Sequence, residues 1–351
     1  MIETARRTAV TTLVVVGIVV LTLALWKLRL VLGLLFFALV IAAAMRPAVE
    51  WLARRRVPPV AGVAIHYLVI FGLIVAALAF AVPRAADQVD HALSPSGKAE
   101  IAHAARTSHG VKHEVLVALQ KRLSHLPQRG DLVKPATQVG RKAFEVIIGI
   151  FFTFAAAAYW ILERDKTIDL VCSLLPRPRR KLVRDTWDLI DAKLGAFVRG
   201  QLILIVLVGT VLSLLFWGIG LPYWLLVGAF AGLVEIVPVI GPLVAGTLAV
   251  AVGLTQSVQL ALLAAGCVIL VRLCEDYIVM PKVLGDAVGL SPLLVLVSVT
   301  TVGILFSGWA VLFAVPIAAV VTTLFDVVLR DVDPAEEDVP AVIFSPKEAE
   351  A

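Results

Sequence analysis

The sequence predicts an all-α membrane protein: a polytopic transmembrane helical bundle of about eight spans, with a Pro/Gly-broken re-entrant region and a polar extracytoplasmic insertion. Hydrophobic residues make up 60% of the 351 residues and charged residues only 16%, whereas soluble domains hold roughly 45–50% and about 25%. Mean hydropathy is +0.97. Apolar runs recur along the chain and basic residues gather between them, as membrane topology requires. The lipid bilayer is therefore the expected environment of this chain.

The net charge of +5 does not indicate nucleic-acid binding, because the basic residues flank apolar segments. Cys172, Cys267 and Cys274 form neither a zinc motif nor a CxxC pair, so we expect no disulfide framework, no metal and no cofactor. The apolar run 9–26 exceeds the core of a signal peptide, and no cleavage site follows it. We expect this run to be a retained first span.

Candidate spans follow from apolar segments that approach the length of a bilayer-crossing helix. They are 9–26, 30–45, 60–82, 144–162, 200–217, 258–271, 290–306 and 309–329. Whether the last two cross fully or form a second hairpin stays open. We accordingly divide the chain into three spans (1–83), an extracytoplasmic helical insertion (84–143), a fourth span with a cytoplasmic amphipathic helix (144–199), a transport core with broken helices (200–330) and an acidic cytoplasmic tail (331–351), expected to be disordered.

Basic residues set the expected orientation, because cytoplasmic loops are enriched in Lys and Arg. Arg6 and Arg7 place the N-terminus inside, and the next inner loop is marked by Arg46, Arg54, Arg55 and Arg56. The densest basic run, 163–199, should also be cytoplasmic. Lys27 and Arg29, in the turn expected between the first two spans, weakly oppose this arrangement. Both termini are then cytoplasmic.

The insertion 84–143 then lies outside the membrane. Val111, Val115, Leu119 and Leu123 recur every fourth residue there and predict an amphipathic helix. The insertion also holds five histidines, His91, His103, His109, His113 and His125. His109 and His113 have a spacing that suits a metal, but no carboxylate or cysteine cluster completes a site. We expect exposed histidines that bind no metal.

A second amphipathic pattern precedes the fifth span. Val183, Trp187, Ile190, Leu194 and Phe197 follow helical spacing, with charged residues on the other faces. Such a helix lies along the membrane surface, contacts another subunit, or packs on its own membrane domain. The pattern does not choose among these three.

The apolar stretch 223–254 is interrupted by Pro238, Gly241 and Pro242. Each half is short for a spanning helix, and the prolines break the backbone hydrogen-bond ladder. A re-entrant hairpin or a discontinuous span follows. The hairpin is favoured, because it makes the next span deliver Arg272 and its acidic neighbours to the cytoplasm.

Glu235 is the one acidic residue within these apolar segments and lies three positions before Pro238. A carboxylate at membrane depth must be protonated, hydrated or paired, which makes it a candidate for proton coupling or cation binding. The alternative is a structural brace for backbone groups freed by the prolines. The candidate substrate- or ion-binding residues are Glu235, Pro238, Gly241, Pro242, Gln201, Arg272, Glu275 and Asp276.

No nucleotide-binding loop, HExxH zinc motif or nucleophile elbow occurs in the sequence, so we expect no enzyme. Several short motifs of the C-terminal half instead follow one another in a specific order. They are Arg199-Gly200-Gln201, Gly220-Leu-Pro222-Tyr223, Glu235-Ile-Val-Pro238-Val-Ile-Gly241-Pro242, Glu275-Asp276-Tyr277, Pro281-Lys282-Val283-Leu284-Gly285, Gly289-Leu290-Ser291-Pro292, Gly303 with Gly308, and Ala314-Val315-Pro316. In this order they resemble the autoinducer-2 exporter family of bacterial membrane proteins. The N-terminal half agrees in layout, whereas Val239 and Ser291 depart from the aromatic residue and histidine frequent in relatives.

The resemblance implies a multi-span carrier, homo-oligomeric, in a bacterial cytoplasmic membrane. Members are described as exporters of autoinducer-2, and others as sodium or lithium ion/proton antiporters. The leading hypothesis is gradient-driven export of a small polar metabolite or signalling molecule, with Glu235 coupling transport to protons. The second hypothesis is a cation/proton antiporter. The lack of an obvious acidic partner for Glu235 counts against it. The third is a non-transporting scaffold that recruits partners.

Overall fold

The computed structural model describes residues 2–93, 106, 133–237, 240–283, 289–306, 308–337, 339 and 342. Its regular elements are helices, and no strand occurs within these ranges. The all-α prediction is confirmed. Six helices are long and apolar enough to cross a membrane: Thr12–Arg54, Pro59–Ala79, Phe144–Ser173, Arg177–Gly218, Val258–Lys282 and Ala310–Leu329. The chain is thus a multi-pass membrane protein.

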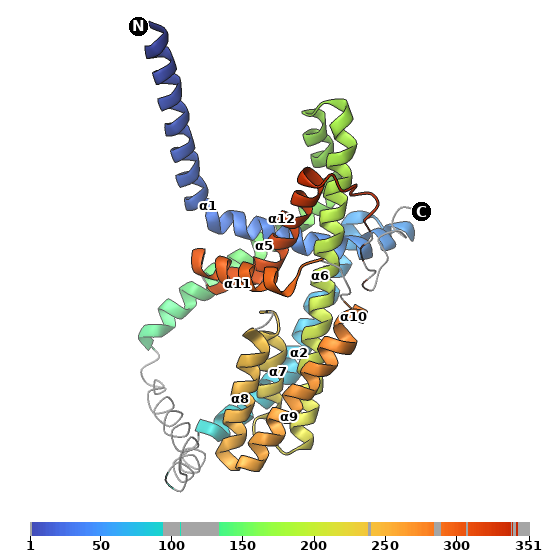
Figure 1. Cartoon of the computed structure of the whole chain (residues 1–351). Coiled ribbons are helices and arrows are strands. Elements are labelled where there is room, and N and C mark those ends of the chain that lie inside the picture. Colours follow the sequence, from blue (N-terminus) through green and yellow to red (C-terminus); the bar gives the residue numbers. More distant parts are fainter. Residues whose placement is uncertain are drawn as a thin grey trace.

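The first helix, α1, runs without interruption from Ile2 to Arg54. The expected turn at Lys27 and Arg29 is therefore wrong, and the expected spans 9–26 and 30–45 form one helix. A search for apolar segments does not reveal that the helix is continuous. Two charged residues on one turn lower the mean hydropathy but leave the helical hydrogen bonds intact. In Figure 1, the N-terminal stretch of α1 stands clear of the other helices before the helix bends toward them. Because α1 does not reverse direction, it does not support the expectation that both of its ends lie on the same side of the membrane.

Helices α2 (Pro59–Leu93) and α5 (Val133–Ser173) contain the third and fourth expected spans and extend into the insertion from both sides. The expected helix over Val111–Leu123, and the histidines 103, 109, 113 and 125, lie outside the described residues. His91 falls within α2. The extracytoplasmic placement of the insertion stays a prediction.

Helix α6 (Arg177–Gly218) joins the expected amphipathic helix and the fifth span into one rod of 42 residues. Its apolar face packs on its own chain: Leu194 is fully buried with Val40, Ala43 and Ala319. Trp187 stacks on Trp160 of α5 with ring centroids 5.7 Å apart. Of the three placements left open, the structure shows packing within the chain. A segment continuous with a spanning helix does not lie flat on the membrane surface.

The broken region forms two short helices, α7 (Trp224–Val234) and α8 (Ile240–Gln256), followed by α9 (Val258–Cys274). Figure 1 shows α7, α8 and α9 side by side along the lower half of α6, with a chain reversal between α7 and α8. The two halves therefore form a helical hairpin rather than one interrupted rod. A core of Val208, Leu212, Phe216, Val227, Ala231, Ala245, Ala249 and Ala264 holds the four helices together.

Close backbone contact joins α6 to α7. A Cβ atom placed on Gly228 would lie 2.2 Å from Oγ of Ser213, and one on Gly232 would lie 2.5 Å from the carbonyl oxygen of Ile205. These pairs run in opposite directions along the two helices, so α7 is antiparallel to α6. Small residues thus let the hairpin fit directly against the rod.

After α9, a π-helical turn η2 (Glu275–Val279) and the short α10 (Met280–Val283) continue the chain. Helix α11 (Pro292–Leu305), the 3₁₀ segment η3 (Gly308–Phe313) and α12 (Ala314–Leu329) follow. The ring of Phe313 meets Phe36 and Phe37 of α1 edge to face. The last helices therefore pack on the first one.

Part of the tail expected to be disordered makes defined contacts. Glu337 pairs with Lys193, and Val342 is buried against Ala196. For these residues the structure differs from the expectation, because buried groups on α6 provide partners that sequence composition does not reveal.

Candidate functional site

The hairpin tip places Glu235 at the C-terminal end of α7, where it is only 5% exposed. Its backbone carbonyl accepts a hydrogen bond from the amide Nε2 of Gln201 on α6 at 3.1 Å. Glu235 caps the C-terminal end of α7, where the last carbonyl groups of a helix need hydrogen-bond partners from outside the helix. Gln201 thereby satisfies a backbone group and fixes the tip to α6.

The carboxylate of Glu235 faces Arg272 near the end of α9. One guanidinium nitrogen, Nη1, lies 3.2 Å from Glu235 Oε1 and 3.2 Å from Glu275 Oε2. The other terminal nitrogen, Nη2, lies 2.9 Å from Asp276 Oδ1. A guanidinium suits this role because its fork of donors serves several carboxylates at once. One cation therefore faces three acidic side chains.

Glu235 and Glu275 share one guanidinium nitrogen, Nη1 of Arg272, so their carboxyl groups lie close to each other. Two ionised carboxylates in such a place repel, and one bound proton relieves this repulsion. Glu275 is 3% exposed, and neither group has free access to water that would screen the repulsion. The pair is chemically suited to hold and release one proton.

The π-helical turn begins at Glu275. Such turns are rare and occur frequently at functional sites. The extra residue in the turn redirects the side chains that follow. Here the turn starts within the polar cluster and ends just before Pro281, which cannot donate a backbone hydrogen bond. Neither the residue types nor their spacing indicates a π-helical turn, so it was not predicted from the sequence.

The remaining candidates shape the hairpin. A Cβ atom on Gly241 would lie 2.2 Å from the carbonyl oxygen of Val234, so only glycine permits this crossing of the two arms. Pro242 stands in the first turn of α8, where the missing N–H has no helical partner to lose. Pro238, together with Val239, lies outside the described residues.

The structure therefore brings together Gln201, Glu235, Arg272, Glu275 and Asp276 from three helices. The expectation that Glu235 has no acidic partner is wrong, since Glu275 lies beside it. Sequence reasoning named both residues but missed their pairing, because they are far apart in the chain and meet only when α9 packs along the hairpin.

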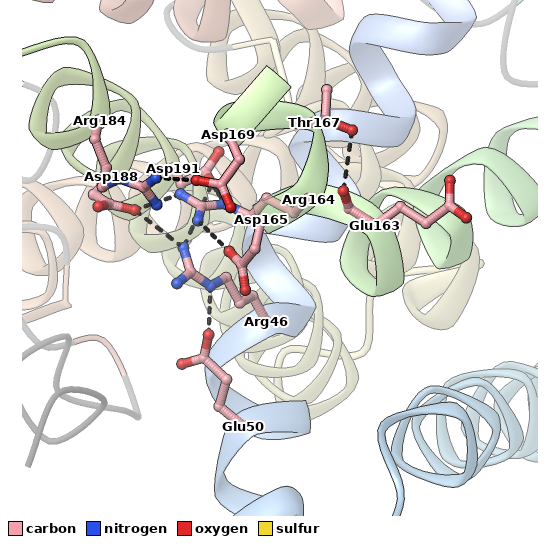
Figure 2. A network of polar contacts seen from close by, with 10 residues as sticks. All are labelled: Arg46, Glu50, Glu163, Arg164, Asp165, Thr167, Asp169, Arg184, Asp188 and Asp191. Carbon is pink, nitrogen blue, oxygen red and sulfur yellow. Dashed lines mark hydrogen bonds and ion pairs between the residues drawn. The ribbon is translucent and has the colours of Figure 1, made fainter. Parts of the chain in front are cut away.

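A second polar network lies where α1, α5 and α6 meet (Figure 2). Arg164 of α5 is 5% exposed and donates to Asp191 Oδ2 at 2.6 Å and to Asp188 Oδ1 at 2.5 Å. Arg46 of α1 lies 3.6 Å from the same two carboxylates and pairs with Glu50. Oδ1 of Asp191 has no hydrogen-bond partner among the described residues. This network was not predicted, because its members lie in three separate sequence segments.

The hairpin also carries an apolar pocket of about 440 Å³, lined by Phe230, Leu243, Val244, Thr247, Leu248 and Ala251. The Thr247 hydroxyl donates to the Leu243 carbonyl, so the lining suits hydrocarbon better than a polar solute. None of the charged residues of the tip lines it. Within the described residues, no group of three His, Cys, Asp or Glu side chains could hold a metal ion.

Comparison with known proteins gives consistent matches. The sequence profile described as "AI-2E family transporter" matches residues 14–330. The protein named "Putative transport protein MT0215" of Mycobacterium tuberculosis is 26% identical over 324 residues, 86% of this chain and 84% of the relative. Two Bacillus subtilis proteins, "Putative transport protein YrrI" and "Putative transport protein YueF", are 27% and 28% identical over 52% and 49% of this chain. The matches span about half the length of these Bacillus relatives, 53% and 47%.

Proposed function

Because the chain belongs to the AI-2E transporter family, we propose that it exports a small polar metabolite or signalling molecule of the autoinducer-2 type, driven by a proton gradient. The observation that carries this proposal is the buried carboxyl pair Glu235–Glu275, bridged by Arg272 at the tip of a hairpin. Broken helices that meet ionisable groups are typical of transporter sites. The family assignment also weighs against the scaffold hypothesis.

The charge balance supplies a coupling mechanism. Arg272 is the accessible member, with 33% of its side chain exposed, whereas both glutamates are buried. When the pair has lost its proton on the cytoplasmic side, both carboxylates accept hydrogen bonds from a polar solute that enters past the accessible guanidinium. When a proton binds from the outside, it removes one of these acceptors and the solute is released outward. Because proton and solute exclude each other at one pair, an inward proton gradient drives export of the solute.

A sodium or lithium ion/proton antiporter is the second candidate, and the position of Glu275 favours it. Sodium and lithium are hard cations that take oxygen ligands, and two adjacent carboxylates provide them. In this reading the cation replaces the shared proton, while Arg272 limits the excess negative charge. The objection that Glu235 stands alone no longer applies.

We further propose that the protein resides in a bacterial cytoplasmic membrane, with the basic α5–α6 end facing the cytoplasm, in keeping with the positive-inside rule. The homo-oligomer also stays a prediction. Site-directed labelling of single cysteines introduced near Arg179 and near Trp217 in intact cells tests the sidedness. Labelling from outside at position 179 would contradict it.

Two assays separate the candidates. In acid-loaded proteoliposomes with an internal pH dye, antiport predicts that sodium or lithium chloride releases protons. In cells that overproduce the chain, export predicts that autoinducer-2 activity or another polar metabolite accumulates in the medium. Glu235→Gln and Glu275→Gln each remove one member of the pair and should reduce the relevant flux at least tenfold.

Glu163→Gln is the matched control, since Glu163 is an exposed carboxylate on α5 and should leave the flux within twofold of wild type. Flux through Glu235→Gln with an unchanged dependence on pH would remove the coupling role of the pair. Absence of flux in both assays would remove transport of these solutes altogether.

A further inference from the structure

The C-terminal segment supplies a counter-charge to a buried cation of α6. Nζ of Lys193 lies 2.6 Å from Oε1 of Glu337 and 3.3 Å from the hydroxyl of Thr323 on α12. The Lys193 side chain is 6% exposed, and Thr323 is fully buried. An ammonium group in such a place is stable only when it is paired. Glu337 therefore contributes to the packing of α6 against α12.

A second cation on the same helix binds the backbone of this segment. Nε of Arg199 donates to the carbonyl oxygen of Val342 at 2.9 Å, and Nη1 donates to the carbonyl oxygen of Ala44 on α1 at 3.2 Å. Arg199 is 7% exposed. One guanidinium thus joins the tail, α6 and α1.

Apolar contacts complete the arrangement. Val342 is 3% exposed and packs on Ala196, which is fully buried, with Val339 and Ile203 at the edges. Lys193, Ala196 and Arg199 follow at intervals of three, so they share one face of α6. This face recognises an acidic side chain, a valine side chain and a backbone carbonyl, which are the features of a short peptide.

We propose that this face of α6 is a peptide-binding site, that the chain's own residues Glu337, Val339 and Val342 are its ligand, and that release of this ligand controls transport. The bound tail engages Arg199 and Lys193, the two side chains through which α6 also contacts α1 and α12. Arg199 lies two residues before Gln201, and the side-chain amide of Gln201 donates a hydrogen bond to the carbonyl of Glu235. Because α6 is one continuous helix, fixing it at Lys193 and Arg199 restrains its movement against the hairpin tip. The effect on transport rests on the proposed function, whereas the binding of the tail does not.

The full-length chain in lipid nanodiscs tests the binding by hydrogen–deuterium exchange. Glu337→Gln removes the charge that pairs with Lys193, and exchange in the tail and in residues 190–203 should become at least fivefold faster. Glu336→Gln is the matched control, because it removes the same charge from an exposed neighbouring residue. It should stay within twofold of wild type. Equal exchange in the two variants would overturn the binding site.

A paired variant separates loss of this contact from general misfolding. Replacing both partners, Lys193→Met with Glu337→Met, removes the unpaired buried charge, and apolar replacements of buried ion pairs are often tolerated. Exchange in residues 190–203 should return to within twofold of wild type. Exchange as fast as in Glu337→Gln alone would show that the Lys193–Glu337 contact is not what holds the tail.

The control of transport is then measured in whichever assay above shows flux with the wild-type chain. Glu337→Gln should raise the rate at least threefold, because a released tail no longer restrains α6, while Glu336→Gln should not change it. A faster-exchanging tail with an unchanged rate would overturn the control step. Failure of wild-type flux would instead count against the proposed function, and the exchange result would stand.

Discussion

At the scale of single residues, the distribution of charge around Arg272 dominates the candidate site. The sequence identified Glu235 by a simple criterion, a carboxylate within apolar segments that lipid does not tolerate. The same criterion did not predict that Glu235 pairs with Glu275, because Glu275 stands at the end of an apolar run, where charged residues are common. Its burial at 3% exposure results from tertiary packing, which no local pattern reports.

Removing the guanidinium should destabilise the protein, since it leaves two buried carboxylates uncompensated. We expect Arg272→Gln to reduce the free energy of unfolding by about 2 kcal/mol or more. This value is below that of a fully buried pair, because a third of the Arg272 side chain is exposed. Thermal unfolding in detergent measures the change as a lower midpoint.

Adding Glu275→Gln to that variant should recover most of the loss, because only one of the two carboxylates then remains. Arg330→Gln is the control: Arg330 pairs with Asp326 on the surface of α12 and has a 66% exposed side chain. Surface pairs contribute about 0–1 kcal/mol. An equal midpoint for the Arg272 and Arg330 variants would argue against a buried charge cluster.

At the scale of helices, apolar windows located the membrane segments but not their ends. The expected span 200–217 matches the C-terminal part of α6, yet the helix continues from Arg177. Charged residues such as Asp191 and Lys193 lower the hydropathy without interrupting helical hydrogen bonds, and their partners come from other helices and from the tail. The break between α7 and α8 was predicted, because prolines and glycine act locally on the backbone.

Because α6 and α7 are in close backbone contact, we expect that adding even a methyl group between them reduces the stability of the protein. Gly232→Ala places a methyl group where the carbonyl of Ile205 and the backbone of Gly209 already lie within 2.5–2.9 Å. Overpacking of this kind costs about 1–3 kcal/mol. The fraction of purified protein that elutes as a single species, together with its unfolding midpoint, should fall.

Gly266→Ala provides the matched change on α9, where no described atom lies within 4 Å of the added carbon. Alanine is the better helix former by about 1 kcal/mol, so this variant should be as stable as wild type or more stable. If both substitutions behaved alike, the backbone contact between α6 and α7 would not exist in solution.

At the scale of the whole molecule, charged side chains rather than loops connect distant parts of the chain. The network of Arg46, Arg164, Asp188 and Asp191 joins three helices. Arg199 of α6 contacts both α1 and the tail, and Lys193 of α6 contacts both α12 and the tail. The sequence predicted the membrane class and the order of segments. It did not predict these junctions. A run of basic residues indicates the cytoplasmic side of the membrane, and this indication is the same whether the side chains face solvent or a buried carboxylate.

Arg164→Gln should therefore destabilise the assembly of α1, α5 and α6. It leaves Asp191, 4% exposed, with only the more distant Arg46 as a counter-charge. We expect a loss of about 3–5 kcal/mol, measured as a lower unfolding midpoint. Arg184→Gln removes an exposed pair with Asp169 on the same helices and should change stability by less than about 1 kcal/mol. Comparable losses in both would contradict the junction.

The charges at the hairpin tip also make membrane voltage relevant to the cycle. Three carboxylates and one guanidinium sum to −2, and one bound proton brings this sum to −1. A charge that crosses the entire membrane potential exchanges about 2.3 kcal/mol per 100 mV. The electric field thus acts on the deprotonated tip with twice the force it exerts on the protonated one, so a change in resting potential shifts the cycle even at constant proton concentrations.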